Sequence, residues 1–289
     1  MTIKHLVLSG GGAAGFTVYG ALKYLNKKNF FNLSDIKSIY ASSAGSIIAG
    51  LVMLSENWDM LDDYILKRPW DKLININPTS LLNLWQKKGI FNEEMIKVIL
   101  KPFLQAKEFD ENITLKQLYE KTNIEIYMYT TNINSLELET VSLSYKSHPD
   151  LEFYKAITMS SAFPLMFMPI CDASNCYVDG GLLNNFPLNN CINLNNDIDE
   201  ILGIKISSNS NNIEYVNNDT LLPMYLYSII IKMYILVNKK NIDIEIPNLV
   251  NCYIEDNSFS KWGNAVVDMS TRQEYISIGE NSAKHFLEH

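Results

Sequence analysis

Residues 39–46 read IYASSAGS, and this short stretch decides how the chain is organised. A β-branched and aromatic pair leads into a run of small residues with Ser43 near its centre. Small residues two positions before and two positions after a serine, here Ala41 and Gly45, permit a sharp turn from a strand into a helix. The same letters are typical of an ordinary helix start, in which Ser42 or Ser43 caps the helix. The stretch therefore indicates a strand–turn–helix unit and leaves the role of the serine open.

The segments on both sides of this turn alternate between expected strands and expected helices. Short apolar runs that end in glycine or polar residues predict strands, and apolar residues at helical spacing predict helices. The expected strands cover 3–8, 36–41, 124–132, 136–143, a short run ending at Val178, and 201–206, which is the last core strand expected. The expected helices cover 15–28, 44–55, 58–66, 92–104, 114–119 and about 261–286, and the Asn-rich stretches 189–197 and 209–218 are expected to be surface loops. This alternation predicts the α/β class, with a mostly parallel central sheet between two helical layers.

The composition is that of a globular chain with an acidic balance. The chain has 289 residues, of which 47% are hydrophobic and 19% charged, and these proportions exclude a mainly disordered protein. Because no repeat or linker interrupts it, we expect one domain over residues 1–286, followed by Leu287-Glu288-His289, which resembles the start of an expression tag. The net charge of −8 argues against nucleic acid as a partner. It also gives no general attraction to anionic lipid, although lysine pairs such as Lys239–Lys240 can make local contacts.

Two apolar segments bear on where the protein acts. The N-terminal MTIKHLVLSGGG has an apolar run too short for a signal peptide and enters a glycine turn directly. Residues 221–237, LLPMYLYSIIIKMYILV, form the most apolar stretch, but they are too short for a comfortable membrane span and contain Pro223 and Lys232. We predict a buried helix here, with an interfacial lipid-docking helix as the alternative. The expected location is cytoplasmic or peripheral to a membrane.

The cysteines predict no metal site. Cys171, Cys176, Cys191 and Cys252 lack the paired CxxC spacing that is typical of zinc ligands. Cys171 and Cys176 are close enough in sequence to bridge across a turn. Because the chain shows no secretory signal, free thiols are the expectation.

A glycine-rich loop, Ser9-Gly10-Gly11-Gly12-Ala13-Ala14-Gly15, joins the first expected strand to the first helix. Glycines let backbone N–H groups approach an anion, and a helix N-terminus adds partial positive charge. Gly10, Gly12 and Gly15 match the GxGxxG pattern, but a dinucleotide site also needs an acidic residue at the end of the second strand. That strand ends in small residues without a carboxylate, which argues against a nucleotide. A glycine-rich turn without any ligand stays open.

A third stretch, Tyr177-Val178-Asp179-Gly180-Gly181, places a carboxylate at the end of a short strand. Asp-Gly by itself is typical of a tight turn. It is preceded by SSAFPLMFMP at residues 160–169 and followed by LLNNFP at residues 182–187.

In order and spacing, the three segments together resemble the patatin-like phospholipase family. That family has a glycine-rich loop after the first strand, GxSxG after the second, and DGG or DGA much later. Further blocks that resemble it are Gly89-Ile90-Phe91, Thr131-Asn132-Ile133-Asn134 and Ile278-Gly279-Glu280, so that the resemblance covers about residues 3–286. Two departures stand out: Ala41 replaces the first glycine of GxSxG, and Ala14 stands where many members have Arg or Lys.

The resemblance implies a patatin-like fold and a Ser–Asp pair that cleaves carboxylic esters of lipids. Ser43 is then the nucleophile and Asp179 the base, with the oxyanion hole formed by the N–H groups of Gly10, Gly11 and Gly12 and of Ala44. It implies a phospholipase A or lysophospholipase type of activity through an acyl-enzyme, without a cofactor or a metal. The expected substrate is a lipid or a membrane surface in peripheral contact, and a protein activator is left open.

The histidines support a mechanism without histidine. An α/β-hydrolase triad runs Ser, Asp, His along the chain. With His289 set aside as part of the expected tag, only His285 is in the right order, and it lies near the C-terminus. His5 is expected in the first strand and His148 in a loop before Pro149.

Two further expectations concern substrate and activity. The helical segment 56–104 carries Trp58, Trp70 and Trp85 and is expected beside the site as a cap, with these aromatics more often core than membrane anchors. The competing function is a catalytically weak or inactive protein that keeps the fold for lipid binding or protein interaction, with Ala41 and Ala14 as marks of lost activity.

Overall fold

The computed structural model describes residues 2–55, 57–73, 84–194, 196–208, 215–240, 244–255 and 259–289. Part of the expected helical segment, residues 74–83, and part of the second Asn-rich stretch, residues 209–214, lie outside the described residues.

Within this part of the chain, a central sheet has eight strands, five of which are parallel. Its strands are β1 (His5–Leu8), β2 (Ser38–Ser42), β4 (Glu125–Asn132), β5 (Glu139–Leu143), β7 (Ile170–Cys171), β8 (Cys176–Asp179), β9 (Ile201–Ser208) and β10 (Asn248–Ile254). Their order is β10-β9-β1-β2-β4-β8-β7, with β5 also paired to β4. The first five in this order run parallel, whereas β5 and β8 are antiparallel to β4. The expected mostly parallel α/β sheet is therefore confirmed. A separate pair joins β3 (Gly89–Phe91) to β6 (Leu165–Phe167).

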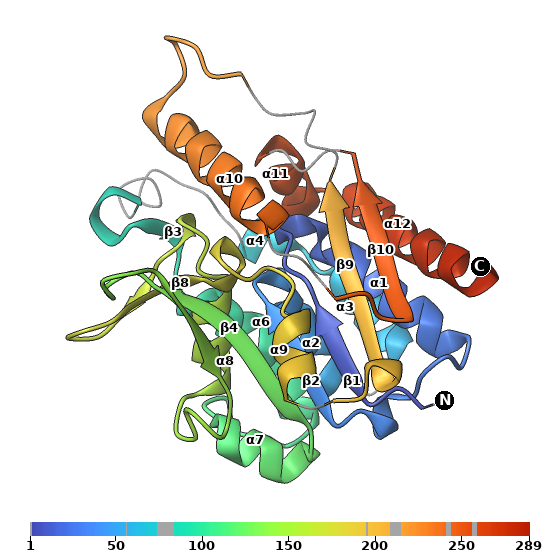
Figure 1. Cartoon of the computed structure of the whole chain (residues 1–289). Coiled ribbons are helices and arrows are strands. Elements are labelled where there is room, and N and C mark those ends of the chain that lie inside the picture. The colour runs from blue at the N-terminus through green and yellow to red at the C-terminus, as the bar shows by residue number, and fades with distance from the viewer. Residues whose placement is uncertain are drawn as a thin grey trace.

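Helices cover the two faces of the sheet unequally (Figure 1). The larger helices are α1 (Gly15–Lys27), α2 (Ala44–Leu54), α3 (Trp58–Lys67), α6 (Glu93–Ala106), α7 (Leu115–Thr122), α8 (Phe153–Ser161), α10 (Leu222–Lys240), α11 (Phe259–Val267) and α12 (Met269–Glu288). Shorter ones are α4 (Trp70–Leu73) and α9 (Leu188–Asn193), with 3-10 turns at Gly12–Ala14, Leu33–Asp35, Gly180–Leu182 and Ile198–Glu200.

Alternation along the strands creates these two layers, because successive side chains point to opposite faces. In β2, Ile39 and Ala41 enter the large core with α1, α2, α6 and α8, whereas Tyr40 enters a smaller core on the opposite face. That second core is closed by Leu188 and Cys191 of α9, which crosses in front of the sheet in Figure 1.

Two secondary-structure expectations were wrong. Residues 201–206 do not form the last core strand, because β10 adds another strand beside β9. Its sequence NLVNCYI includes two asparagines, which interrupt the apolar pattern even though Val250 and Cys252 are fully buried. The first Asn-rich stretch contains helix α9, whose apolar residues fold against the sheet.

The expectation of free thiols was wrong for two cysteines. Cys171 and Cys176 form a disulfide, whereas Cys191 and Cys252 are free and buried. The reason is the hairpin register, because Cys171 of β7 lies directly opposite Cys176 of β8.

The expectation of a buried helix at residues 221–237 was also wrong. The stretch forms most of α10, but several of its large apolar side chains are exposed. Because large apolar residues occupy both faces of this helix, the apolar spacing does not predict which face is covered, and the packing decides it. None of the helices in the described ranges combines the length and the apolar character required to cross a membrane.

Candidate active site

Ser43 occupies a strained turn between β2 and α2. Its backbone has φ 52° and ψ −130°, a left-handed conformation that non-glycine residues seldom adopt. A Cβ at residue 45 would lie 2.7 Å from the carbonyl oxygens of Leu8 and Ser9, so Gly45 is required for α2 to pass this close to β1. Ala41, by contrast, has its methyl group fully buried in the large core. The turn therefore accommodates alanine at position 41 but needs glycine at position 45.

The end of α8 holds this turn in place. Ser43 donates its backbone N–H to both the carbonyl and the hydroxyl oxygen of Ser160, each at 3.1 Å. Ser161 Oγ donates to the carbonyl of Ser43 at 3.0 Å, and Ser46 Oγ lies 2.8 Å from Ser160 Oγ. These serines belong to the SSAFPLMFMP block, whose resemblance to the family assigned them no function. The only signal in the sequence is the pair of adjacent serines three residues before Pro164.

The register of β4 brings Asp179 to Ser43. Ser42, the last residue of β2, pairs with Tyr129, and Asp179, the last residue of β8, pairs with Thr130. Because residues 128–132 of β4 also pair with β5 on the other edge, β2 and β8 lie end to end along the same edge. Two strands far apart in the sequence therefore end at consecutive positions of a third.

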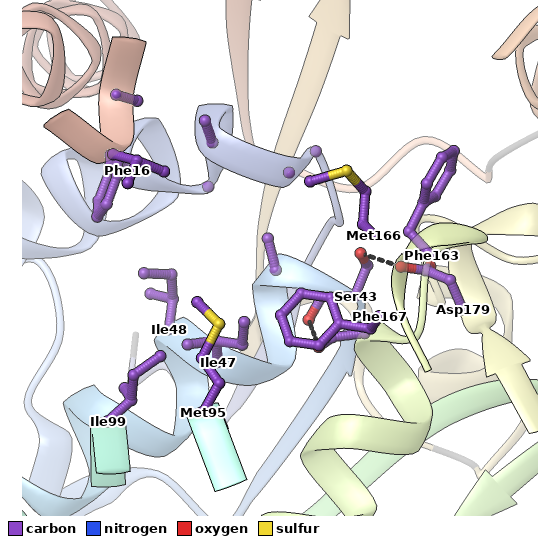
Figure 2. A pocket seen from close by; sticks show the side chains of 18 of the residues that line it. Phe16, Ser43, Ile47, Ile48, Met95, Ile99, Phe163, Met166, Phe167 and Asp179 are labelled. Atoms are coloured by element: carbon purple, nitrogen blue, oxygen red, sulfur yellow. Dashed lines mark hydrogen bonds between the residues drawn. The ribbon is translucent and has the colours of Figure 1, made fainter. Parts of the chain in front are cut away.

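The side chains of Ser43 and Asp179 form a short, buried hydrogen bond (Figure 2). Ser43 Oγ donates to Asp179 Oδ2 at 2.5 Å, and the N–H of Gly181 donates to the other carboxylate oxygen at 2.7 Å. Asp179 is 1% exposed. Burial raises the pKa of Asp179 to about 7, against the opposing effect of these two hydrogen bonds. A carboxylate with this pKa can accept a proton near neutral pH.

The glycine loop lies against the same pair of residues. A Cβ at residue 10 would lie 2.7 Å from Ser43 Cβ, so the absence of a side chain permits this approach. Gly11, Gly12 and Ala44 line the cavity beside Ser43, whereas Gly10 does not. The N–H of Gly10 instead donates to the carbonyl of Asn185 at 3.0 Å. Gly10 is therefore dropped from the expected set of oxyanion donors.

An apolar cavity of about 220 Å³ extends from Ser43 and Asp179 between α2 and α6. Figure 2 shows Ile47 and Ile48 of α2 facing Met95 and Ile99 of α6 at one end. Nearer Ser43 the wall consists of Phe163, Met166 and Phe167, which belong to the SSAFPLMFMP block.

The expected cap at residues 56–104 does contribute to this cavity. Ile65 and Trp70 line it together with the residues of α6. Trp58 and Trp70 pack in the core as expected, whereas Trp85 is 67% exposed.

Helix α10 closes the cavity from another side. Tyr227, Ile231 and Tyr234 face into it. Burial, followed by the negative charge of Asp179, raises the pKa of Tyr234, so its phenol stays protonated. Asn238 Nδ2 donates to the carbonyl of Gly181 at 2.8 Å, and Asn238 Oδ1 accepts from the N–H of Asn185 at 3.1 Å. The helix is thus attached to the loop that follows Asp179.

The histidines lie elsewhere, and none of the residues lining the described cavity is a histidine. His5 Nδ1 lies 2.7 Å from Ser38 Oγ in the sheet, and His148 Nδ1 lies 2.9 Å from Ser147 Oγ in a loop. Across the described ranges, no cluster of three or more His, Cys, Asp or Glu side chains has the geometry to hold a metal ion.

Comparison with known proteins identifies the family. The sequence model of the patatin-like phospholipases matches residues 6–192, a range that contains the glycine loop, the Ser43 turn and Asp179. The chain belongs to the patatin-like phospholipase family. This membership supports lipid hydrolysis as the class of activity. Ser43 and Asp179 lie in the two segments of the matched range that resemble the GxSxG and DGG motifs of the family.

The patatin-like chain has viral relatives. It is 32% identical over 195 residues to "Probable lipid hydrolase 463L" of Invertebrate iridescent virus 6, covering 67% of this chain and 64% of that protein. It is 29% identical over 239 residues to "Uncharacterized protein R571" of Acanthamoeba polyphaga mimivirus, covering 83% and 77%. The crystal structure of VipD from Legionella pneumophila has a TM-score of 0.55 at 18% identity, covering 99% of this chain and 67% of that one, and it shows the shared fold.

Proposed function

We propose that this patatin-like protein is a serine lipid acyl hydrolase of the phospholipase A or lysophospholipase type. The observation that carries the proposal is the 2.5 Å hydrogen bond between Ser43 Oγ and Asp179 Oδ2 beside an apolar cavity. A hydroxyl activated by a buried carboxylate supplies the nucleophile, and the cavity supplies a place for an acyl chain.

In the first half of the reaction, Ser43 Oγ attacks the carbonyl carbon of the ester while Asp179 takes its proton. An ordinary aspartate is a weak base for a hydroxyl, with a pKa of about 3.9. The pKa of Asp179 is about 7, which brings proton transfer closer to balance at neutral pH. The protonated Asp179 then gives its proton to the leaving alcohol as the ester bond breaks.

The developing oxyanion needs N–H donors that point to one position. We assign this role to the backbone N–H groups of Gly11, Gly12 and Ala44, which line the cavity beside Ser43. Ala44 is the first residue of α2, where N–H groups lack an acceptor within the helix and the helix dipole is positive. Loss of one such donor costs on the order of 3 kcal/mol of transition-state stabilisation.

In the second half, water hydrolyses the acyl-enzyme. Asp179 removes a proton from the water as it attacks the acyl carbon, and the proton returns to Ser43 Oγ when the acid departs. The N–H of Gly181 holds the carboxylate in the same orientation throughout.

The competing function is lipid binding without catalysis. Its motivation is the replacements at Ala41 and Ala14. Activity is supported because Ala41 packs into the large core while Ser43 keeps its hydrogen bond to Asp179. Ala14 is fully buried and packs with Tyr275 in a small core, and it takes no part in the Ser43–Asp179 hydrogen bond.

Two measurements separate these functions. Wild type and Ser43→Ala are compared for hydrolysis of a medium-chain p-nitrophenyl ester, and for covalent labelling by a fluorophosphonate, which reacts preferentially with activated serines. Hydrolysis and labelling in the wild type alone support the proposal. Equal background hydrolysis together with no labelling of the wild type, on liposomes as well as in solution, would contradict the proposal and favour the binding function.

A further inference from the structure

Helix α10 presents a continuous apolar stripe to solvent. Exposed residues recur along it at every third or fourth position, as one face of a helix does. This outer face consists of Leu222, Tyr225, Leu226, Ile229, Lys232, Met233, Leu236 and Lys239. The exposed fraction of its apolar side chains ranges from 37% at Ile229 to 61% at Met233. Single exposed apolar residues are common, but six on one stripe are typical of an interaction surface.

The opposite face of the same helix belongs to the candidate active site. Tyr227, Ile231 and Tyr234 line the cavity, and Asn238 is hydrogen-bonded to the loop after Asp179. The outer face is therefore separated from the cavity by the width of one helix, about 10 Å. Figure 1 shows α10 at the edge of the molecule, on the side toward which the β9 arrow points.

The charges on α10 differ from those of the whole chain. The chain carries a net charge of −8, yet residues 222–240 include Lys232, Lys239 and Lys240 and contain no acidic residue. Lys232 and Lys239 lie two helical turns apart on the outer face. Apolar side chains interleaved with lysines suit an anionic bilayer, because the apolar groups enter between headgroups while the ammonium groups stay among the phosphates.

The helix has the right dimensions to lie flat on a membrane. Its 19 residues extend over about 28 Å at roughly 1.5 Å per residue. Since the helix is not apolar enough to cross a membrane and is fixed along its inner face, only the outer face is available to lipid.

We propose that the outer face of α10 docks the protein on an anionic lipid bilayer, next to the lipids that enter the cavity. The link to substrate entry rests on the proposed hydrolase function, whereas docking itself requires no catalysis. The net negative charge of the remaining surface then orients the protein with α10 toward the membrane.

The test measures flotation with vesicles of phosphatidylcholine and phosphatidylserine in a 3:1 ratio. Ser43→Ala serves as the parent, so that no lipid is consumed. Ile229→Glu together with Met233→Glu should weaken binding at least tenfold, because two carboxylates would have to enter the headgroup region. Ile198→Glu is the matched control. The exposed fraction of Ile198, 39%, is similar to the 37% of Ile229, but Ile198 precedes β9 at the opposite end of the sheet. The control should bind within twofold of the parent.

A second pair of substitutions tests the charges. Lys232→Gln with Lys239→Gln should weaken binding about tenfold on vesicles containing phosphatidylserine and leave binding to phosphatidylcholine alone unchanged. Thermal melts establish that each variant is folded before flotation. The charge variant also keeps the test decisive if the double glutamate variant fails to fold.

The outcomes separate docking from catalysis. Unchanged flotation of the outer-face variants, or equal losses in Ile198→Glu, would overturn the docking proposal. So would a concentration-dependent dimer that Ile229→Glu dissociates, because the face would then bind a second copy of the chain. Hydrolysis of the soluble p-nitrophenyl ester by the Ser43-containing protein reports on the proposed function separately. Active enzyme without vesicle binding defeats docking alone, and vesicle binding without ester hydrolysis defeats catalysis alone.

Discussion

Gly10 and Asn185 exchange two hydrogen bonds. The N–H of Gly10 donates to the carbonyl of Asn185 at 3.0 Å, and Asn185 Nδ2 donates back to the carbonyl of Gly10 at 3.1 Å. Asn185 Oδ1 is buried and has no hydrogen-bond partner among the described residues. These contacts join the glycine loop, with its proposed oxyanion donors, to the segment that follows Asp179. The two halves of the proposed machinery are thus held together by one residue.

Replacing Asn185 should therefore lower the rate without abolishing substrate binding. We expect Asn185→Ala to reduce kcat about tenfold and to change KM less than twofold. The glycine loop loses the hydrogen bond from Asn185 Nδ2 and is aligned less well, while the apolar cavity walls persist. Steady-state kinetics with a p-nitrophenyl ester provide the measurement. Asn190→Ala is the control. It removes the hydrogen bond that Asn190 Oδ1 accepts from Asn184 and leaves the contacts of Gly10 intact, so it should retain wild-type kcat. A kcat for Asn185→Ala equal to that of the wild type would contradict the positioning role.

The pH dependence of hydrolysis should follow Asp179. The carboxylate form is the base, and the pKa of Asp179 is about 7, so kcat/KM should fall about tenfold per pH unit below this value. Asp179→Asn should abolish the activity, and with it the fall of kcat/KM at low pH. A profile that stays flat between pH 5 and pH 8 would exclude Asp179 as the base.

Asp179 should also affect stability, with a definite sign. Because its folded-state pKa is raised, the folded protein binds the proton more tightly than the unfolded chain does. This group's contribution is therefore most favourable below about pH 4 and is lost as the pH rises toward 7, by up to about 1.4 kcal/mol per pH unit. Urea unfolding of wild type and Asp179→Asn across this range checks it. As the pH increases, the unfolding free energy of the wild type should decrease relative to that of Asp179→Asn.

The two small residues flanking Ser43 should respond differently to substitution. Gly45→Ala places a Cβ 2.7 Å from two backbone carbonyl oxygens, and we expect it to destabilise the protein by about 3 kcal/mol and to eliminate activity. Ala41→Gly removes one buried methyl group and should cost only about 1 kcal/mol while activity remains. Thermal melts and ester hydrolysis of both variants provide the comparison. Equal effects of the two substitutions would contradict the asymmetry of the turn.

The cavity should determine which acyl chains are accepted. Met95→Trp fills the end of the cavity between α6 and α2, so hydrolysis of long-chain esters should drop about tenfold while that of butyrate esters stays within twofold. Val98→Trp is the matched control, because Val98 lies on the same helix with its side chain 37% exposed. A chain-length profile for Met95→Trp that coincides with that of Val98→Trp would show that acyl chains lie elsewhere.

Several features were predictable because they depend on local chemistry. The turn at Ser43 needs small neighbours, and the strand–helix alternation follows from apolar spacing. Both could therefore be predicted from the sequence. The strand β10 and the helix α9 were missed because asparagines interrupt their apolar patterns, although neighbouring elements bury them. The disulfide between Cys171 and Cys176 was not predictable from the missing signal peptide, because it depends on the hairpin that pairs these residues.

By itself, the sequence determined the α/β class and the family resemblance and pointed to Ser43 and Asp179 as candidate catalytic residues, since motif spacing and residue type suffice for these. Only the tertiary structure decided how they meet. The side-chain oxygens lie 2.5 Å apart across 136 positions of sequence because β2 and β8 end at adjacent residues of β4, and pairing register is a property of the assembled sheet. The two faces of α10 were decided in the same way. Large apolar residues occur on both of its faces, so packing against the cavity decides which of them remain exposed.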